Sequence, residues 1–139
     1  MLFRSKSTYA RKLAAEQGAR VIEGDVIRRQ ISKGPAPVLW TELEDAIEAE
    51  IQEVLPEPLI LDGPHCCRHE RRQATDLLQS YGYDVIAVVL RTPLEECLLR
   101  NARRSRSVPR HAITRWRNSL ERELSTIPTE SFKEVITIS

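Results

Sequence analysis

Two short, unbroken apolar segments most constrain what this chain can fold into. Residues 59–61 (Leu-Ile-Leu) and residues 85–90 (Val-Ile-Ala-Val-Val-Leu) contain no polar residue in alternation. Strands with this pattern belong in a sheet that is covered on both faces, because a sheet with one wet face carries polar residues at every second position. Helical patterns separate these segments along the chain. The sequence therefore predicts an α/β domain with a mostly parallel sheet.

Helical periodicity defines the elements between the strands. The apolar positions of the longest clear pattern, over residues 41–54, predict one buried helix face: Leu43, Ile47, Ile51 and Val54 or Leu55. We expect Thr41 and Glu44 to form a capping box at the start of this helix. The other predicted helices cover residues 7–17, 25–31, 68–81, 92–104 and 109–124, and the other predicted strands cover residues 20–22 and 135–138.

Glycine, proline and threonine mark several helix ends. Thr92 is the expected N-cap of the helix over residues 92–104, with Pro93 as its first residue. Gly18 and Gly82 are expected to follow the last turns of two other helices. The chain has 139 residues, which is the length of one domain, so we expect a single domain over residues 1–139.

Composition excludes several classes of protein. The formal net charge is +1, which gives no overall signal for nucleic acid or a membrane surface. No apolar run approaches the roughly 20 residues that span a bilayer, and the N-terminus lacks the apolar core of a secretory signal. The three cysteines, two of them adjacent, make a poor disulfide framework, so we expect free thiols in the reducing cytoplasm.

A cluster of histidine and cysteine after residue 64 contains residue types that bind metals. His65, Cys66, Cys67 and His69 lie close in sequence, but no second pair of ligands follows at zinc-type spacing. The simpler interpretation is a helix N-terminus that happens to carry these residues, and we expect no metal there.

Near-neutrality hides an acidic and a basic segment. Residues 40–57 hold seven carboxylates and no base, and residues 100–117 hold seven arginines and no acid. A solvated charged face is the ordinary explanation for the acidic segment. Arginine matches the geometry of phosphate oxygens, so the basic segment is also a candidate phosphate-binding region, and it is the one stretch that offers a surface to nucleic acid.

The first predicted helix opens with Lys6, Ser7 and Thr8. A Lys-Ser/Thr pair at a helix start is the end of the phosphate-binding loop G-x-x-x-x-G-K-[ST], in which the lysine reaches phosphates and the hydroxyl holds Mg²⁺. The tripeptide alone is a weak signal, since chance often produces it. Ser5 stands where the second loop glycine would be, and no glycine precedes Gly18.

Charged residues follow three of the predicted strands. Asp25, Asp62 and Arg91 would face one crevice, because ligands bind at the carboxyl ends of parallel strands. Asp25 and Arg28 are one helical turn apart, so the carboxylate could accept a proton from an attacking hydroxyl and the arginine could orient it. Asp62 could hold Mg²⁺ through water. The alternatives are a helix-capping Asp25 beside a surface arginine, and a turn aspartate at position 62.

Four arginines suggest a mobile lid at about residues 100–110. Arg100, Arg103 and Arg104 come to one face of a helix by spacing, and Arg106 follows before Pro109. Such a lid would neutralise phosphate charge during transfer. A solvated basic face is the alternative.

The order of these features resembles one family. The matching segments run in chain order as 6–10 (Lys-Ser-Thr-Tyr-Ala), 25–28 (Asp-Val-Ile-Arg), 61–62 (Leu-Asp), 70–72 (Glu-Arg-Arg), 81–83 (Tyr-Gly-Tyr), 92–97 (Thr-Pro-Leu-Glu-Glu-Cys), 100–104 (Arg-Asn-x-Arg-Arg) and 108–109 (Val-Pro). The chain resembles P-loop kinases of the polynucleotide-kinase-like group, often labelled AAA-family ATP-binding proteins. The resemblance covers residues 6 to about 122, and residues 92–109 are its most specific part.

The resemblance implies a P-loop NTPase fold, a nucleoside-kinase-like three-layer sandwich, and transfer of the γ-phosphoryl group of ATP to a hydroxyl acceptor with Mg²⁺. Lys6 would bind the phosphates with Thr8, and Ser7 would ligate the metal with Asp62 as second carboxylate. Asp25 would be the general base with Arg28 at the acceptor. The lid arginine would be Arg104, with Arg100 and Arg103 beside it. Relatives often carry Asp-x-Asn or Asp-x-Thr where this chain has Asp62-Gly63-Pro64-His65.

The resemblance also implies a central strand before the phosphate loop, and five residues before Lys6 cannot supply it. The expectations are a truncated kinase, a degenerate relative, or a sheet with a gap, and we favour truncation because the downstream residues are all present. The acceptor would be a polynucleotide 5′-hydroxyl or a small metabolite. The alternative is a non-catalytic nucleotide-binding or regulatory domain with the same fold.

Overall fold

The computed structural model describes residues 4–32, 34, 37–63, 65, 67–103 and 108–138, and the side chains from residue 6 onward. The chain divides into two compact units. One is Ser5–Gly63, and the other is Pro64–Ser139 together with Met1–Arg4. No helix in the described part of the chain is long and apolar enough to cross a membrane.

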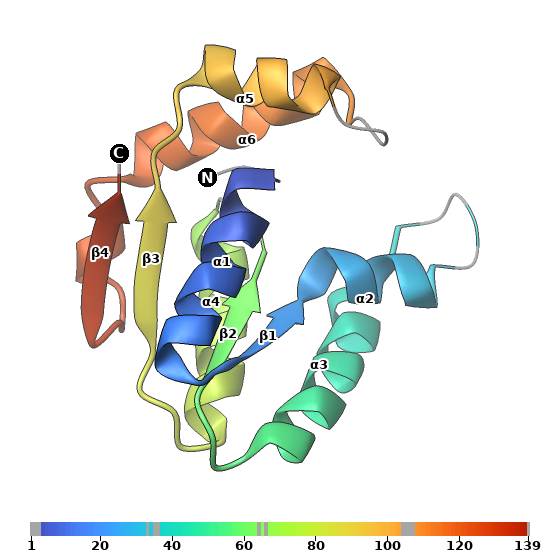
Figure 1. Cartoon of the computed structure of the whole chain (residues 1–139), viewed down its shortest axis with the longest axis vertical. Coiled ribbons are helices and arrows are strands. Elements are labelled where there is room, and N and C mark those ends of the chain that lie inside the picture. Colours follow the sequence, from blue (N-terminus) through green and yellow to red (C-terminus); the bar gives the residue numbers. More distant parts are fainter. Residues whose placement is uncertain are drawn as a thin grey trace. The chain divides into compact units, whose positions relative to one another are not determined.

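The unit Ser5–Gly63 is built around two parallel strands. Its elements are α1 (Arg4–Gln17), β1 (Arg20–Glu23), α2 (Gly24–Ile31), α3 (Trp40–Val54) and β2 (Leu59–Asp62). The strands pair in register, with Arg20 opposite Leu59 and Glu23 opposite Asp62. Helices α2 and α3 connect the carboxyl end of β1 to the start of β2 (Figure 1). Glu23 and Asp62 therefore end their strands side by side.

Helix α3 supplies much of the core of this unit. The residues expected on its buried face are buried: Leu43, Ile47, Ile51 and Val54. Leu55 follows the helix and is 37% exposed, so Val54 is the residue that completes the face. The predicted capping box was wrong, because the helix begins at Trp40 and its N-cap is Leu39. The carboxylate of Glu42, one turn inside the helix, accepts the backbone N–H of Leu39 at 3.3 Å.

The unit containing residues 64–139 holds a second pair of parallel strands. Its elements are α4 (Arg68–Ser80), β3 (Ile86–Leu90), α5 (Leu94–Ala102), α6 (Arg110–Glu123), a short 3-10 helix η1 (Ile127–Thr129) and β4 (Glu134–Ile138). Ile86 lies opposite Glu134 and Leu90 lies opposite Ile138. Helices α5 and α6 lie side by side in the connection from β3 to β4 (Figure 1).

Helix α5, over Leu94–Ala102, begins later and ends earlier than the sequence predicts. Its N-cap is Pro93 and its first residue is Leu94, so Thr92 lies outside it. The carbonyl oxygen of Thr92 accepts the Nε–H of Arg117 from α6 at 2.7 Å, and this contact holds Thr92 in the connection rather than at the cap. Gly82 after α4 has φ of 86°, which confirms its predicted place at a left-handed helix end.

The parallel pairing of the strands is confirmed, but their grouping is not. The four described strands form two two-stranded sheets, β1 with β2 and β3 with β4, rather than one sheet. Burial on both faces is also incomplete, since Ile86 of β3 is 47% exposed and Ile136 of β4 is 38% exposed. An apolar run identifies a strand, whereas the backbone hydrogen bonds that group strands into sheets leave no mark on side-chain type.

Candidate functional site

The first turn of α1 carries the lysine and hydroxyl residues of the expected phosphate-binding motif. The helix begins at Arg4, so Lys6 and Ser7 lie in its first turn, and no acidic residue lies there. The first four N–H groups of a helix have no partner within the helix, and they favour an anion. Thr8 follows on the same helix and is exposed. The sequence prediction that Lys6 and Ser7 open a helix is confirmed.

Asp62 brings this helix start to the end of β2. Its Oδ2 accepts a hydrogen bond from Ser7 Oγ at 2.9 Å, and its Oδ1 lies 2.8 Å from Lys6 Nζ. The Asp62 side chain is 3% exposed and that of Lys6 is 12% exposed. Oδ1 is buried and accepts no well-directed hydrogen bond from the described residues, so its contact with Lys6 is mainly electrostatic. Asp62 is thus a buried strand-end carboxylate with both oxygens engaged, not a solvated turn residue.

Asp25 reaches the same cluster from α2. The parallel register puts Glu23 beside Asp62, and a Cβ on Gly24 would lie 3.4 Å from the carbonyl oxygen of Asp62, so α2 starts close against the end of β2. The Oδ2 of Asp25 lies 3.9 Å from Lys6 Nζ, and the Asp25 side chain is 49% exposed. The N-cap of α2 is Glu23, so the alternative of Asp25 as a helix cap was wrong.

Arg28 lies one turn beyond Asp25 on α2. Its side chain is exposed, and in the described part of the chain the contacts nearby involve its neighbour Arg29, which donates to the carbonyl oxygen of Asp25 at 3.3 Å. The expected spacing of Asp25 and Arg28 on one helix is confirmed. Arg28 is thus an exposed residue one helical turn from the half-exposed Asp25.

The cluster of Lys6, Ser7, Asp25 and Asp62 combines three chemical functions. Ser7 Oγ and the Asp62 carboxylate are hard oxygen donors of the kind that Mg²⁺ prefers. Mg²⁺ takes six oxygen ligands, so these two donors would leave coordination positions for water and phosphate oxygens. No group of three His, Cys, Asp or Glu side chains suited to a metal is found among the residues the structure describes. Lys6 supplies a positive charge, and Asp25 supplies a carboxylate that a second molecule can reach. This donor set fits a Mg²⁺–phosphate complex.

The predicted lid arginines lie in the other unit. Arg100 on α5 forms an ion pair with Glu96 one turn earlier, and its side chain is 36% exposed. Helix α5 ends at Ala102, so Arg103 is its C-cap and is exposed. Its backbone is still helical, since its N–H donates to the Leu99 carbonyl oxygen at 3.2 Å. Arg104 and Arg106 lie outside the described residues, so the single helical face of Arg100, Arg103 and Arg104 stays a prediction.

Arg91 follows β3 as predicted, but its partner is on α6. Arg91 Nη2 lies 3.2 Å from Glu121, which also accepts a hydrogen bond from Arg117 Nη1 at 2.6 Å. The hydrogen bond from Arg117 lowers the pKa of Glu121, and the charges of both arginines add to this effect. Arg91 is occupied by this exposed ion-pair network, which sequence spacing did not predict.

Asn101 closes the arginine-rich connection between α5 and α6. Its Nδ2 donates to the carbonyl oxygen of Val108 at 2.7 Å, and its Oδ1 accepts the Val108 N–H at 2.8 Å. Asn101 is 4% exposed. A single buried amide thus satisfies both backbone groups of Val108, as a paired strand would, and no sequence pattern distinguishes this asparagine from an exposed one.

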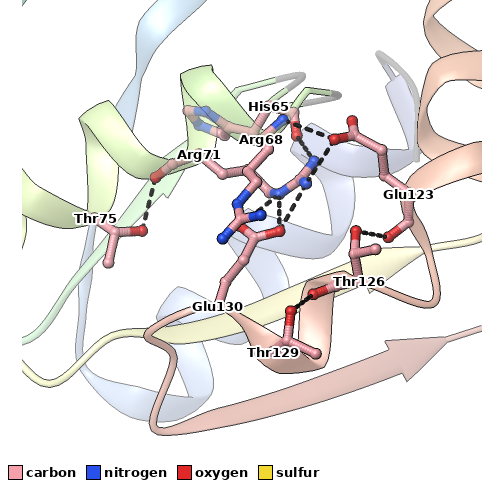
Figure 2. Close-up of polar contacts among 8 residues, drawn as sticks. All are labelled: His65, Arg68, Arg71, Thr75, Glu123, Thr126, Thr129 and Glu130. Carbon is pink, nitrogen blue, oxygen red and sulfur yellow. Dashed lines mark hydrogen bonds and ion pairs between the residues drawn. The ribbon is translucent and has the colours of Figure 1, made fainter.

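A second polar cluster surrounds Arg71 on α4 (Figure 2). Its guanidinium donates to both carboxylate oxygens of Glu130, at 2.8 Å from Nη2 and 3.0 Å from Nε, and Nη1 donates to the His65 carbonyl oxygen at 3.1 Å. Glu123 from the end of α6 lies 3.4 Å from Nη2 and accepts the Arg68 N–H at 3.1 Å. Burial is the largest single influence on the pKa of Arg71, and it lowers that pKa. The hydrogen bonds and charges of Glu130 and Glu123 together outweigh burial, so the pKa of Arg71 is raised.

The Arg71 cluster is structural and was missed from the sequence. In the sequence, Arg71 is distinguished only by its place in the resembling segment 70–72, and its neighbour Arg72 has the same residue type. Arg71 is 6% exposed and joins α4 to η1 and to His65, which has φ of 41°. Arg71 and Arg72 are adjacent residues of the same type on one helix, so the sequence does not indicate which of the two is buried.

The cysteines of the described part are free thiols. Cys67 is half-buried and Cys97 is buried, and Cys66 lies outside the described residues. Burial raises the pKa of the Cys97 thiol, whose Sγ lies 3.6 Å from the Thr92 carbonyl oxygen.

Comparison with known proteins identifies the family of the chain. A family model described as an AAA domain matches residues 4–123, which include the first turn of α1, Asp25, Asp62 and helices α5 and α6. None of the curated proteins compared with the chain matches it. The family has the P-loop NTPase fold, and the short parallel strands of this chain are compatible with it. The chain belongs to the AAA domain family, a kinase-related group of P-loop NTPase-like, nucleotide-binding proteins.

Proposed function

We propose that this chain is a kinase-like domain that transfers the γ-phosphoryl group of ATP to a hydroxyl acceptor. One observation carries the proposal: the buried Asp62 carboxylate lies 2.9 Å from the Ser7 hydroxyl and 2.8 Å from the Lys6 ammonium, at the start of a helix that is distant in sequence. Burying a carboxylate carries a desolvation cost, and buried ionisable groups with specific charge partners are concentrated at functional sites. Family membership supports nucleotide as the ligand.

The nucleotide end of the site is assigned to α1 and β2. Lys6 would contact the phosphates, the first-turn N–H groups and Thr8 would hold them, and Ser7 and Asp62 would hold Mg²⁺. When bound, the metal would neutralise charge on the transferring phosphoryl group. The burial of Asp62, at 3% exposure, suits a metal-holding group better than a base that must meet an acceptor.

The acceptor end is assigned to α2. Asp25 is 49% exposed, so an acceptor hydroxyl can approach its carboxylate, which would take the proton as the hydroxyl attacks phosphorus. Arg28, one turn away and exposed, would orient the acceptor or bind its phosphate. Asp25 is half-exposed and Asp62 is buried, which supports the assignment of Asp25 as the base and Asp62 as the metal-holding group.

The lid and the domain organisation remain predictions. Arg100, Arg103 and Arg104 would contact the transferring phosphate from the region at about residues 100–110, within one kinase-like domain over residues 1–139. Arg100 would have to exchange Glu96 for phosphate, which is inexpensive because the pair is at a surface. We further propose that the acceptor is a polynucleotide 5′-hydroxyl or a small metabolite. We also propose that the protein is cytoplasmic.

The test is transfer of label from γ-labelled ATP with Mg²⁺ to a 5′-hydroxyl oligonucleotide and, separately, to a pool of small hydroxyl metabolites. Asp25→Asn should abolish transfer and leave ATP binding intact, while the matched control Asp45→Asn, on an exposed position of α3, should change neither. Binding of ATP without transfer to any acceptor would favour the non-catalytic alternative. Undiminished transfer by Asp25→Asn would refute the assignment of the base.

A further inference from the structure

We propose that Lys6 makes the cation site of Ser7 and Asp62 selective for a divalent ion that arrives with phosphate oxygens, and closes it to the free ion. The inference rests on the proposed role of Ser7 and Asp62 as metal-holding groups. It assigns Lys6 a second role, as the internal cation that occupies the Asp62 carboxylate in the free protein.

Both oxygens of the Asp62 carboxylate already have partners within this chain. One oxygen accepts the Ser7 hydroxyl at 2.9 Å, and the other lies 2.8 Å from the Lys6 ammonium. The side chains of Lys6 and Asp62 are 12% and 3% exposed, so this pair is largely removed from water. A divalent ion can reach the carboxylate only by displacing the ammonium or by binding beside it.

Charge makes binding beside the ammonium unfavourable. Lys6 also lies 3.9 Å from Asp25, so the ammonium is the shared positive charge between two carboxylates. A free dication would meet one net negative charge from these three groups and would be repelled by the ammonium itself. Two protein oxygen donors are also few for an ion that strongly retains its hydration shell.

A polyphosphate changes both the pairing of the Lys6 ammonium and the number of oxygen ligands available to the ion. Its oxygens give the ammonium a new partner, so Lys6 can leave Asp62 without becoming an unpaired buried charge. They also add oxygen ligands to the ion, which completes the coordination that Ser7 and Asp62 begin. The site should therefore bind the metal–phosphate complex in preference to either the free metal or a free anion.

The experiment measures binding of Mn²⁺ alone, by calorimetry and by the loss of its free-ion EPR signal, in the 139-residue chain. Mn²⁺ prefers the same oxygen ligands as Mg²⁺ and is directly observable. The original chain should bind Mn²⁺ weakly, and Lys6→Met should bind it at least about tenfold more tightly, because one nearby like charge is removed. The control Lys12→Met, an exposed lysine on the same helix, should behave as the original chain.

Two further variants separate the site from general charge effects. Lys6→Met with Asp62→Asn should lose the gain in Mn²⁺ affinity, because the carboxylate that binds the ion is gone. Lys6→Gln can still donate a hydrogen bond to Asp62, and it should also show the gain if the Met variant fails to fold. Equal Mn²⁺ affinity of the original chain and the folded Lys6 variant would overturn the proposal. Failure of both Lys6 variants to fold at any Mn²⁺ concentration would overturn it too, because an ion that fits the site should replace the missing ammonium.

The outcome is independent of the kinase proposal. Mn²⁺ binding is read without ATP or acceptor, so a gain in Lys6→Met without any phosphoryl transfer would retain the role of Lys6 and refute the proposed activity. Conversely, phosphoryl transfer by the original chain with no gain in Lys6→Met would retain the activity and refute the role of Lys6 as internal cation.

Discussion

Replacement of Arg71 by methionine should destabilise the protein severely. Methionine approximates the length of the arginine stem and removes its charge. The change leaves Glu130 buried with no counter-charge and leaves the His65 carbonyl oxygen without its 3.1 Å donor. Arg71 joins α4 to residues near the end of α6 and at η1 (Figure 2), so the loss affects how these elements are held together.

The structure sets the size of the effect. The side chains of Arg71 and Glu130 are 6% and 8% exposed, and breaking a buried ion pair by removing one partner costs about 3–5 kcal/mol. The contact with Glu123, whose side chain is 26% exposed, adds little to that figure because solvent screens it. For a chain of this length the loss corresponds to a fall in Tm of roughly 10–20 °C.

The assay is chemical and thermal unfolding followed by circular dichroism. The matched control is Arg72→Met on the next position, where the side chain is 77% exposed and its partner Asp76 is 64% exposed, and it should cost below about 0.5 kcal/mol. Arg71→Met with Glu130→Gln should recover part of the loss, because no buried charge is left unpaired. Equal free energies of unfolding for the Arg71 and Arg72 variants would refute the role assigned to the buried cluster.

Three further predictions, two substitutions and one labelling experiment, test separate features. Gly82→Ala should lower the free energy of unfolding by about 1 kcal/mol, because φ is 86° there although the space is open, and an unchanged value in urea unfolding would contradict this. Glu121→Gln should destabilise the protein slightly at neutral pH. The Arg117 hydrogen bond lowers the folded-state pKa of Glu121, so the stabilisation by the ionised carboxylate is present above the ordinary pKa of 4.5 and is lost as pH falls through the lower folded-state pKa. The free energies of unfolding of the original and Glu121→Gln proteins should therefore converge in acid. A difference that stays constant with pH would argue against the pairing. Cys97 should be alkylated more slowly than Cys67 at mildly alkaline pH, because it is buried and its pKa is raised, and peptide mapping that shows equal rates would disprove this.

Residues whose spacing alone decides their environment were predicted well. The buried face of α3 follows from the apolar positions, and the end of α4 at Gly82 follows from the need for a left-handed residue. Asp62 was placed at a strand end because an apolar run precedes it. The Lys6–Ser7 helix start was predicted from a short motif that becomes specific only with Asp62 beside it.

Features that depend on distant partners were not predictable from spacing. Arg71 and Arg72 have the same residue type and adjacent positions, yet the one is buried and the other is exposed because Glu130, far along the chain, meets only Arg71. The start of α3 at Trp40 depends on one backbone contact from Glu42 to Leu39, which competes with the equally plausible Thr41 box. The grouping of strands into two pairs depends on backbone hydrogen bonds that no side chain records.

The central claim is that Lys6 and Ser7, held against Asp62, form a nucleotide-binding site. The most direct measurement is calorimetric titration of the 139-residue chain with ATP and Mg²⁺, repeated with Lys6→Ala and with the exposed-lysine control Lys12→Ala. Saturable binding that Lys6→Ala loses and Lys12→Ala keeps is the predicted result. Absence of binding by the original chain, or equal binding by all three proteins, would contradict the claim.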